Sequence, residues 1–292
     1  MKKMRRILYF LPLFLLFSCT EDIVIDLEKG VSMIGVDACF TDQCKRHEVV
    51  LSYSADFYHS HDIRMVSGAR VRIVGGGDTV VFAESDSLKG HYFSDSVAGK
   101  KCTLYRLEMD VPMADGSGRY EQLYAESYMG DNVDRIDSVV LRLSDDPVMR
   151  MLGDIYSFYP YFQTLSDPQI NYLIHVFQND SQLTHLQNTL PFSAAGYAGF
   201  YCNGPEMRAN NMLISIFNLK KENLHDSDLF RIEFQSVPLD YMLFAYSLLS
   251  SSGSNPMMGS PANVPTNVFP KGRGVGFFHA ASVVSCEVRY LP

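Results

Sequence analysis

Short runs of alternating apolar and polar residues recur along most of the chain and constrain its fold more than any other feature. Alternation puts every second side chain on the same face, so each run predicts a strand with one buried face. In the first part of the chain the runs recur at a spacing of roughly ten residues, which is typical of antiparallel sandwiches of the immunoglobulin or transthyretin type. The clearest runs cover residues 47–53, 70–74, 79–82, 90–93 and 102–109.

A glycine-rich connection joins two of these runs. Gly75, Gly76 and Gly77 lie between residues 70–74 and 79–82. A phosphate-binding loop would require the GxxxxGK[ST] spacing followed by a helix, and the chain shows neither at this point. Glycine here supplies the positive φ angles of a tight turn, so the segment predicts a β-hairpin.

The second part of the chain also reads as strands, with one exception. Pro, Gly and Ser gather at residues 112–118, which predicts a joint between a sandwich domain over 31–111 and a β-rich domain over 113–292. The exception is a segment in which Leu239, Met242, Leu243 and Tyr246 follow helical spacing. It predicts a single helix over about 238–250 that packs on a sheet through this stripe. The predicted strands cover residues 135–143, 169–177, 212–217, 229–234 and 275–281, the last extending toward Tyr290.

The first residues form a targeting segment. Four Lys or Arg residues precede the apolar run Ile7–Phe17, which at about 1.5 Å per residue is too short to cross a bilayer core of about 30 Å. This layout predicts a signal peptide over 1–18. Leu16-Phe17-Ser18-Cys19 resembles a bacterial lipobox, which would make Cys19 the fatty-acylated (palmitate-bearing) first residue of the mature chain, followed by a tether over 19–30. The alternative is a conventional signal peptide near which Cys19 merely lies.

Charge limits the partners. With 25 Lys and Arg against 33 Asp and Glu, the chain has a net charge of −8. We expect no nucleic-acid partner, because phosphates would be repelled over most of the surface. The lipid anchor makes the membrane the first expected partner. Glu21 and Asp22, shortly after Cys19, resemble an export tag and predict a position on the cell outer membrane that faces outward.

Five cysteines remain in the mature chain. Cys39 and Cys44 flank a predicted turn, and this spacing predicts a disulfide between them. The alternative is a set of buried, inert thiols. None of the five has CxxC spacing, which argues against a zinc ribbon or a thioredoxin-type site.

Motifs of catalytic and metal sites are scarce. The chain has no GxSxG and no HExxH. The best metal-like cluster is His59, His61 and Asp62, in which the two imidazoles would share a face of an extended strand. Zinc needs three or four convergent ligands, so we predict no metal and no other cofactor. No catalytic residues are identified, and whether the protein is an enzyme stays open, with binding favoured.

The order of several motifs resembles family 4249 of the domains of unknown function, which are lipoproteins of Bacteroidota. The likeness rests on the lipobox with residues 23–27, on 66–71, on 135–139, and on 255–256 and 261–268 closing at 274–278. The family has no established activity. Its members tend to accompany TonB-dependent receptors, so the resemblance implies an outer-membrane transporter as a partner.

Three functions follow as hypotheses. The first is a non-enzymatic, surface-exposed lipoprotein that serves as an accessory or ligand-binding component of a TonB-dependent receptor system. The second is a pilin-like structural or adhesive subunit that works by strand addition. The third is a hydrolase with a site at the domain joint.

Overall fold

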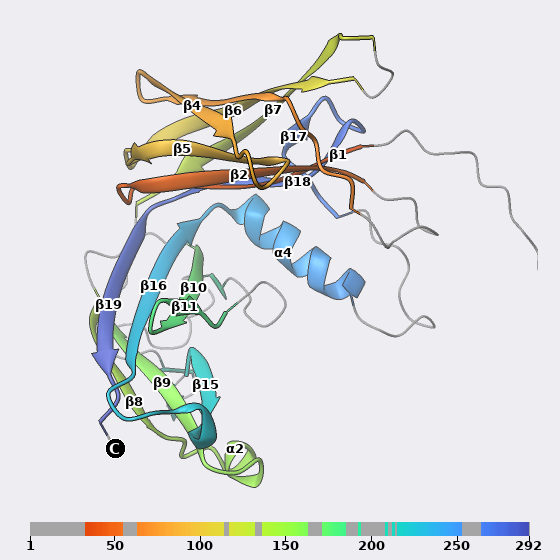
Figure 1. Ribbon diagram of the computed structural model, residues 1–292. Coiled ribbons are helices and arrows are strands. Elements are labelled where there is room, and N and C mark those ends of the chain that lie inside the picture. The colour runs from red at the N-terminus through yellow and green to blue at the C-terminus, as the bar shows by residue number, and fades with distance from the viewer. Residues whose placement is uncertain are drawn as a thin grey trace, which may run out of the picture. The chain divides into compact units, whose positions relative to one another are not determined.

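The structure is a computed structural model, and it describes residues 33–54, 63–113, 117–131, 136–162, 171–184, 192–193, 208–209, 212–213, 215–252 and 264–291. The predicted signal peptide, Cys19, the tether and the cluster of His59, His61 and Asp62 lie outside these residues. The described chain is mainly β, as the sequence predicts (Figure 1). None of its helices combines the length and apolar character that crossing a bilayer requires.

The largest element is a nine-stranded sheet whose neighbouring strands are antiparallel except for the parallel pair β1–β18. Val36, Ala38 and Phe40 point into its core because alternate residues of a strand share a face. In spatial order the strands are β17 (Val268–Phe269), β7 (Tyr120–Met129), β6 (Thr103–Pro112), β3 (Arg70–Gly75), β4 (Asp78–Glu84), β5 (His91–Val97), β2 (Lys45–Tyr53), β1 (Ile34–Thr41) and β18 (Gly274–Ala281).

Side chains bridge β7 and β18, which lie near the two ends of this sheet. The Asn267 amide donates to the carbonyl oxygens of Glu126 at 2.9 Å and Phe278 at 2.7 Å, and it accepts from the Phe278 N–H. Ser127 Oγ accepts from the Ala280 N–H at 2.9 Å. The sheet is therefore nearly closed on itself, and these side chains satisfy backbone groups that an open edge would leave unpaired.

The predicted glycine hairpin is confirmed. β3 and β4 pair antiparallel from Val71–Phe82 to Gly75–Asp78, and Gly76 and Gly77 turn the chain with φ values of 60° and 85°. A turn with two successive positive φ angles matches the right-handed twist of the strands it joins.

Two smaller sheets pack together around a second core formed by residues such as Phe158, Tyr172 and Phe234. One contains β11 (Ser181–Gln182), β10 (Asn171–Gln178), β16 (Leu229–Val237) and β19 (Val283–Arg289), with β12 (Phe192–Ser193) paired to β10. The other contains β15 (Phe217–Lys220), β9 (Ile155–Phe162) and β8 (Ile136–Leu143). The remaining elements are β13 (Arg208–Ala209), β14 (Met212–Leu213), α2 (Pro147–Met151), a 3-10 turn at Lys221–Asn223, and α4 (Leu239–Ser252).

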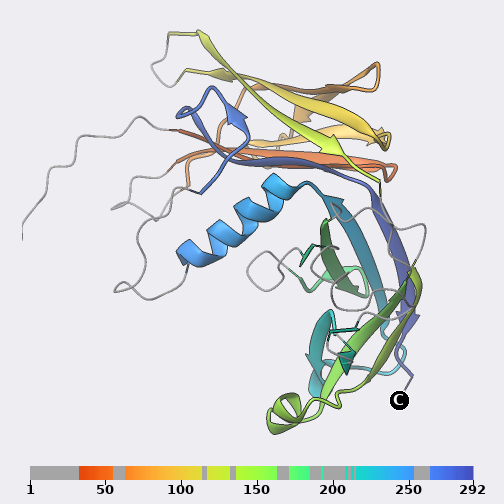
Figure 2. The ribbon, with the colours of Figure 1, turned by 180° about the vertical axis from the view of Figure 1, so that it is seen from behind.

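The chain passes repeatedly between the sheets. β18 ends in the nine-stranded sheet at Ala281, and β19 begins at Val283 beside β16, a continuation that Figure 2 shows from behind. The nine-stranded sheet takes β1–β6 from the predicted domain over 31–111 and β7, β17 and β18 from the range 113–292. The division into these two domains stays a prediction.

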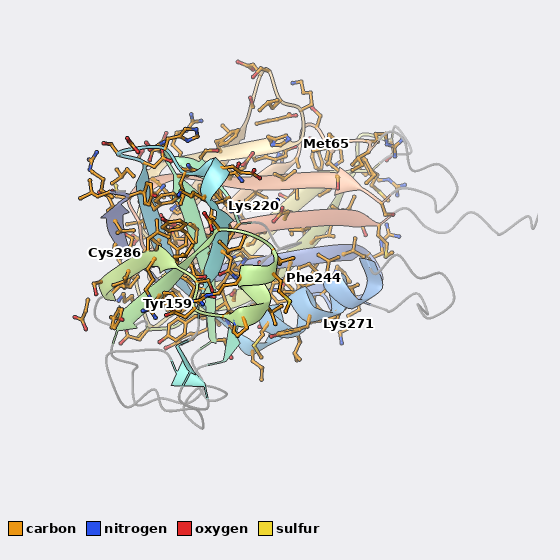
Figure 3. All side chains as sticks on the ribbon, turned by 90° about the horizontal axis from the view of Figure 1, so that it is seen from below. Met65, Tyr159, Lys220, Phe244, Lys271 and Cys286 are labelled. Atoms are coloured by element: carbon orange, nitrogen blue, oxygen red, sulfur yellow. The ribbon has the colours of Figure 1, made fainter. Side chains whose placement is uncertain are left out.

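Helix α4 is found where the sequence predicts it, but the predicted packing face is wrong. Leu239, Leu243 and Tyr246 are 57%, 52% and 44% exposed, whereas Tyr241 and Ala245 are buried. The helix is apolar on several sides, so its spacing alone could not identify the buried face. Aromatic contacts identify the buried face: the rings of Tyr241 and Phe244 lie 5.4 and 5.2 Å from that of Phe277, the first edge-to-face and the second tilted. Figure 3 labels Phe244 on this helix.

Candidate functional site

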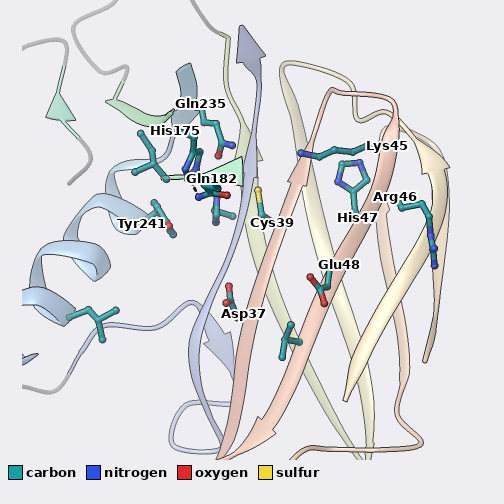
Figure 4. Close-up of a pocket in the computed structure, with 14 residues that line it drawn as sticks. Asp37, Cys39, Lys45, Arg46, His47, Glu48, His175, Gln182, Gln235 and Tyr241 are labelled. Carbon is teal, nitrogen blue, oxygen red and sulfur yellow. Dashed lines mark hydrogen bonds between the residues drawn. The ribbon is translucent and has the colours of Figure 1, made fainter. Parts of the chain in front are cut away.

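A cavity of about 780 Å³ lies between the outer face of β18, β1 and β2 and the elements β10, β11, β16 and α4 (Figure 4). In Figure 4, Asp37, Glu48 and Lys45 lie on one side, and Tyr241, His175 and Gln235 on the other. Its lining residues are Asp37, Cys39, Lys45, Arg46, His47, Glu48, Val50, Leu173, His175, Gln182, Gln235, Tyr241, Leu248 and His279.

Strand alternation supplies the first wall. Because Val36, Ala38 and Phe40 face the core, Asp37 and Cys39 face the cavity. β18 lies parallel to β1 in a register that sets Phe277 beside Asp37 and His279 beside Cys39. The wall therefore carries a carboxylate, a thiol and an imidazole on neighbouring strands.

The face of β10 and β16 that points away from the second core supplies the opposite wall. Leu173 pairs directly with Gln235, and His175 with Glu233, so these side chains share one face. The Gln182 amide nitrogen lies 3.1 Å from His175 Nδ1 and donates to the Thr184 carbonyl oxygen at 2.5 Å. These contacts fix the His175 ring against the wall.

His279 is a buried titratable group on the cavity wall. Its side chain is 7% exposed, and its ring stacks on that of Tyr241 with 4.0 Å between centroids. Burial lowers the pKa of His279 to about 3, and the neighbouring His175 and Lys45 act in the same direction. The imidazole is therefore neutral at pH 7, and its Nε2 has no hydrogen-bond partner among the described residues.

Gln235 presents a second buried atom without a partner. The residue is 5% exposed, and its Oε1 accepts no hydrogen bond within the described part of the chain. A buried polar atom left unsatisfied costs about 1–3 kcal/mol. Gln235 Oε1 and His279 Nε2 therefore lie on one cavity with unused hydrogen-bonding capacity.

Two carboxylates, Asp37 on β1 and Glu48 on β2, line the first wall. Glu48 Oε1 lies 2.6 Å from His91 Nδ1, whereas Asp37 makes no hydrogen bond or ion pair with a described side chain. The surrounding walls desolvate Asp37, and the charge of Glu48 adds to this effect, so the pKa of Asp37 is raised. Asp37 nevertheless remains open to the solvent of the cavity.

The protonation states of Cys39 and His279 do not favour a nucleophilic thiolate in the cavity. Cys39 and His279 are register neighbours, the arrangement in which an imidazole could activate a thiol. Burial raises the pKa of Cys39 to about 12, so the sulfur stays protonated. The neutral His279 therefore faces a thiol, not a thiolate.

The predicted site residues have different outcomes. Cys39 lines the cavity from β1, whereas Cys44 is exposed in the turn after it, and both thiols are free, so the predicted bridge is not formed in this structure. Cys39 points to the cavity within a paired strand, and its spacing from Cys44 could not reveal that direction. Lipidation of Cys19 stays a prediction, and His59, His61 and Asp62 lie outside the described residues.

Sequence reasoning missed His279, Gln235, Tyr241 and Asp37. Each is a single polar or amphipathic residue in an ordinary strand or helix, and no motif joins them. A polar residue on an apolar strand, such as His279 in residues 275–281, was the one available signal. Across the described chain, no three His, Cys, Asp or Glu side chains converge as metal ligands.

The fold and the cavity define a mainly β protein with a pocket lined largely by polar side chains. A family profile, Domain of unknown function (DUF4249), matches residues 20–287, and the chain belongs to this family. A comparison with curated protein sequences finds no match.

Solved structures resemble the chain weakly. One is a Ca²⁺-stabilized adhesin with which an Antarctic bacterium binds ice: 13% identity, TM-score 0.23, covering 72% of this chain and 45% of the adhesin chain. Another concerns the host cell surface retention of a 1.5-MDa bacterial ice-binding adhesin: 7% identity, TM-score 0.21, covering 91% of this chain and 66% of the other. The chain thus spans less than two thirds of either structure, and similarities this low carry no functional argument.

Proposed function

We propose that this protein is a non-enzymatic binding protein whose ligand occupies the cavity between β1, β18, β16 and α4. One observation carries the proposal: Gln235 Oε1 and His279 Nε2, from different strands, are buried on the same cavity without hydrogen-bond partners among the described residues. Cavities of about 300–1,000 Å³ with apolar walls and a few placed polar groups are typical of small-molecule sites.

Location forms the second part of the proposal. A fatty-acylated Cys19 would hold the binding body on the outer membrane, facing outward, as an accessory of a TonB-dependent receptor. The family match begins at residue 20, directly after Cys19, which supports Cys19 as the start of the mature chain. The anchor would keep the cavity near a transporter that takes up the bound solute.

The experiment blocks the cavity with a single side chain. Val50 lines the cavity from β2 and does not belong to the core, so Val50→Trp fills the cavity without disturbing that core. Val81→Trp, at a β4 position that is 68% exposed, is the matched control. Melting temperatures are measured for the wild type and both variants with short peptides, oligosaccharides, nucleosides and fatty acids.

We expect one solute class to raise the melting temperature of the wild type and of Val81→Trp by several degrees, because ligand at about 100 times Kd stabilises the fold by about 2.7 kcal/mol. Val50→Trp should show no shift with that class. The proposal is refuted if no class stabilises the wild type, or if Val50→Trp responds equally.

A second candidate function, the strand-adding adhesive subunit, is favoured by β8. This strand is at the end of its sheet, and Val140 and Leu143 on it are 39% and 46% exposed. Exposed apolar end strands invite pairing with another chain. Sedimentation of the purified protein tests this candidate. It is supported if the wild type forms polymers and Val140→Lys does not, and it is contradicted if the wild type stays monomeric at all concentrations.

A further inference from the structure

Two charges of opposite sign lie at separate places on the cavity wall, and neither has an ion-pair partner among the described residues. The Asp37 carboxylate has no described ion-pair partner. The Lys45 ammonium donates to Gln43 Oε1 at 3.0 Å, and that amide is neutral. Charged groups that face a cavity without counter-charges favour a ligand that supplies them.

The spacing of these charges limits the ligand's length. Asp37 pairs across the sheet with Val50, and Lys45 lies five residues further along β2. At about 3.3 Å per residue and about 4.8 Å between neighbouring strands, the two backbone positions are roughly 17 Å apart. Figure 4 shows Asp37 and Lys45 toward different ends of the cavity, with Cys39 between them. Allowing for the reach of both side chains, a zwitterion about 10 Å long fits, which is an extended chain of three to four residues.

The middle of the cavity suits a peptide backbone. Gln235 Oε1 can accept an N–H, and His279 Nε2 can donate to a carbonyl oxygen or accept an N–H according to its tautomer. A peptide alternates these groups along its length. Leu173, Leu248 and Val50 offer apolar surface to its side chains.

We propose that the cavity binds a short peptide of three to four residues with free termini, its ammonium group at Asp37 and its carboxylate at Lys45. This inference rests on the proposed binding function and names its ligand class. A free amino acid is too short to reach both charges. Sugars commonly use an open aromatic face, and the face of Tyr241 is occupied by the ring of His279.

The test uses the tripeptide alanyl-leucyl-alanine in three forms: with free termini, N-acetylated, and C-amidated. Binding to the full mature protein is measured by calorimetry. We expect acetylation and amidation each to weaken binding to the wild type about tenfold or more, because each removes one charge contact. These comparisons need no variant, so a folding defect cannot obscure them.

Variants then assign each end. Asp37→Asn should weaken the binding of the free peptide and leave the binding of the acetylated form unchanged. Lys45→Gln should weaken the binding of the free peptide and leave the binding of the amidated form unchanged. In each case the modified peptide already lacks the charge contact that the variant removes. Asp86→Asn and Lys220→Gln, at exposed charged residues that do not line the cavity, are the matched controls.

The outcomes separate the two proposals. The peptide inference is overturned if the tripeptide does not bind, or if its blocked and free forms bind equally. The binding function still stands in that case when another solute class stabilises the wild type but not Val50→Trp. If no solute class gives a response that depends on Val50, both are overturned.

Discussion

At the scale of single residues, His279 couples stability to pH. Burial lowers its pKa to about 3, against about 6.5 in an unfolded chain. Between these values the unfolded state binds the proton more readily, so the free energy of unfolding falls as the pH falls, by up to about 1.4 kcal/mol per pH unit.

The variant His279→Phe keeps a ring against Tyr241 and removes the titrating group. Urea denaturation of both proteins at several pH values between 4 and 7 measures the effect. We expect the difference in unfolding free energy to shift in favour of the variant as the pH decreases. A difference that is constant over this range would contradict the assignment of a buried, neutral imidazole.

Gly276 is required by steric contact as well as by backbone conformation. Its φ is 89°, and a Cβ there would lie 2.1 Å from the Val36 carbonyl oxygen of the paired strand. Gly77 has a φ of 85°, and no atom of the described residues lies within 4 Å of the position that its Cβ would take. The pair therefore separates the cost of a positive φ from the cost of a clash.

We expect Gly77→Ala to cost about 1 kcal/mol of stability, as replacement at a positive φ does. Gly276→Ala should cost well over 3 kcal/mol or prevent folding, because β1 and β18 must separate. Thermal denaturation with circular dichroism measures both, and equal melting temperatures would show that the close approach of β1 and β18 is wrong.

At the scale of elements, Asn267 connects β7 and β18. Asn267→Ala leaves backbone groups of Glu126 and Phe278 without their side-chain partner, which should cost about 2–4 kcal/mol. Asn223→Ala, at an exposed residue, is the control. Urea denaturation measures the free energy of unfolding of both variants. If Asn267→Ala loses no more unfolding free energy than the control, the sheet does not depend on this bridge.

Helix α4 provides two tyrosines for comparison. Tyr241 is 4% exposed and packs against Phe277, whereas Tyr246 is 44% exposed. Tyr241→Ala should therefore cost about 3–5 kcal/mol and Tyr246→Ala about 1 kcal/mol or less. If Tyr246→Ala cost more than Tyr241→Ala, the buried face of α4 would be the one that the sequence predicts.

At the scale of the whole molecule, the proposed anchor decides where the binding body lies. Replacing Cys19 by Ala should release the protein from the membrane, because no acyl chain can then be attached. Cys44→Ala, which removes an exposed thiol elsewhere, should leave it bound. Cell fractionation and immunoblotting compare the two variants. Equal membrane retention of both would refute lipidation at Cys19.

The sequence alone determined the kind of elements in this protein. Alternation at 70–74 and 79–82, with glycines between them, predicts a β-hairpin. Helical spacing near residue 240 predicts the ends of α4 to within two residues. These are local effects, because side-chain direction and turn geometry depend on near neighbours.

Tertiary structure alone decided the buried face of α4, the closure of the sheet through Asn267, and the cavity. The cavity joins β1, β10, β16 and β18, whose residues are up to about 240 positions apart in the sequence. Their meeting follows from strand order, and strand order is set by packing over the whole chain, which no local pattern records. His279 and Gln235 therefore became a site only when the fold buried them together.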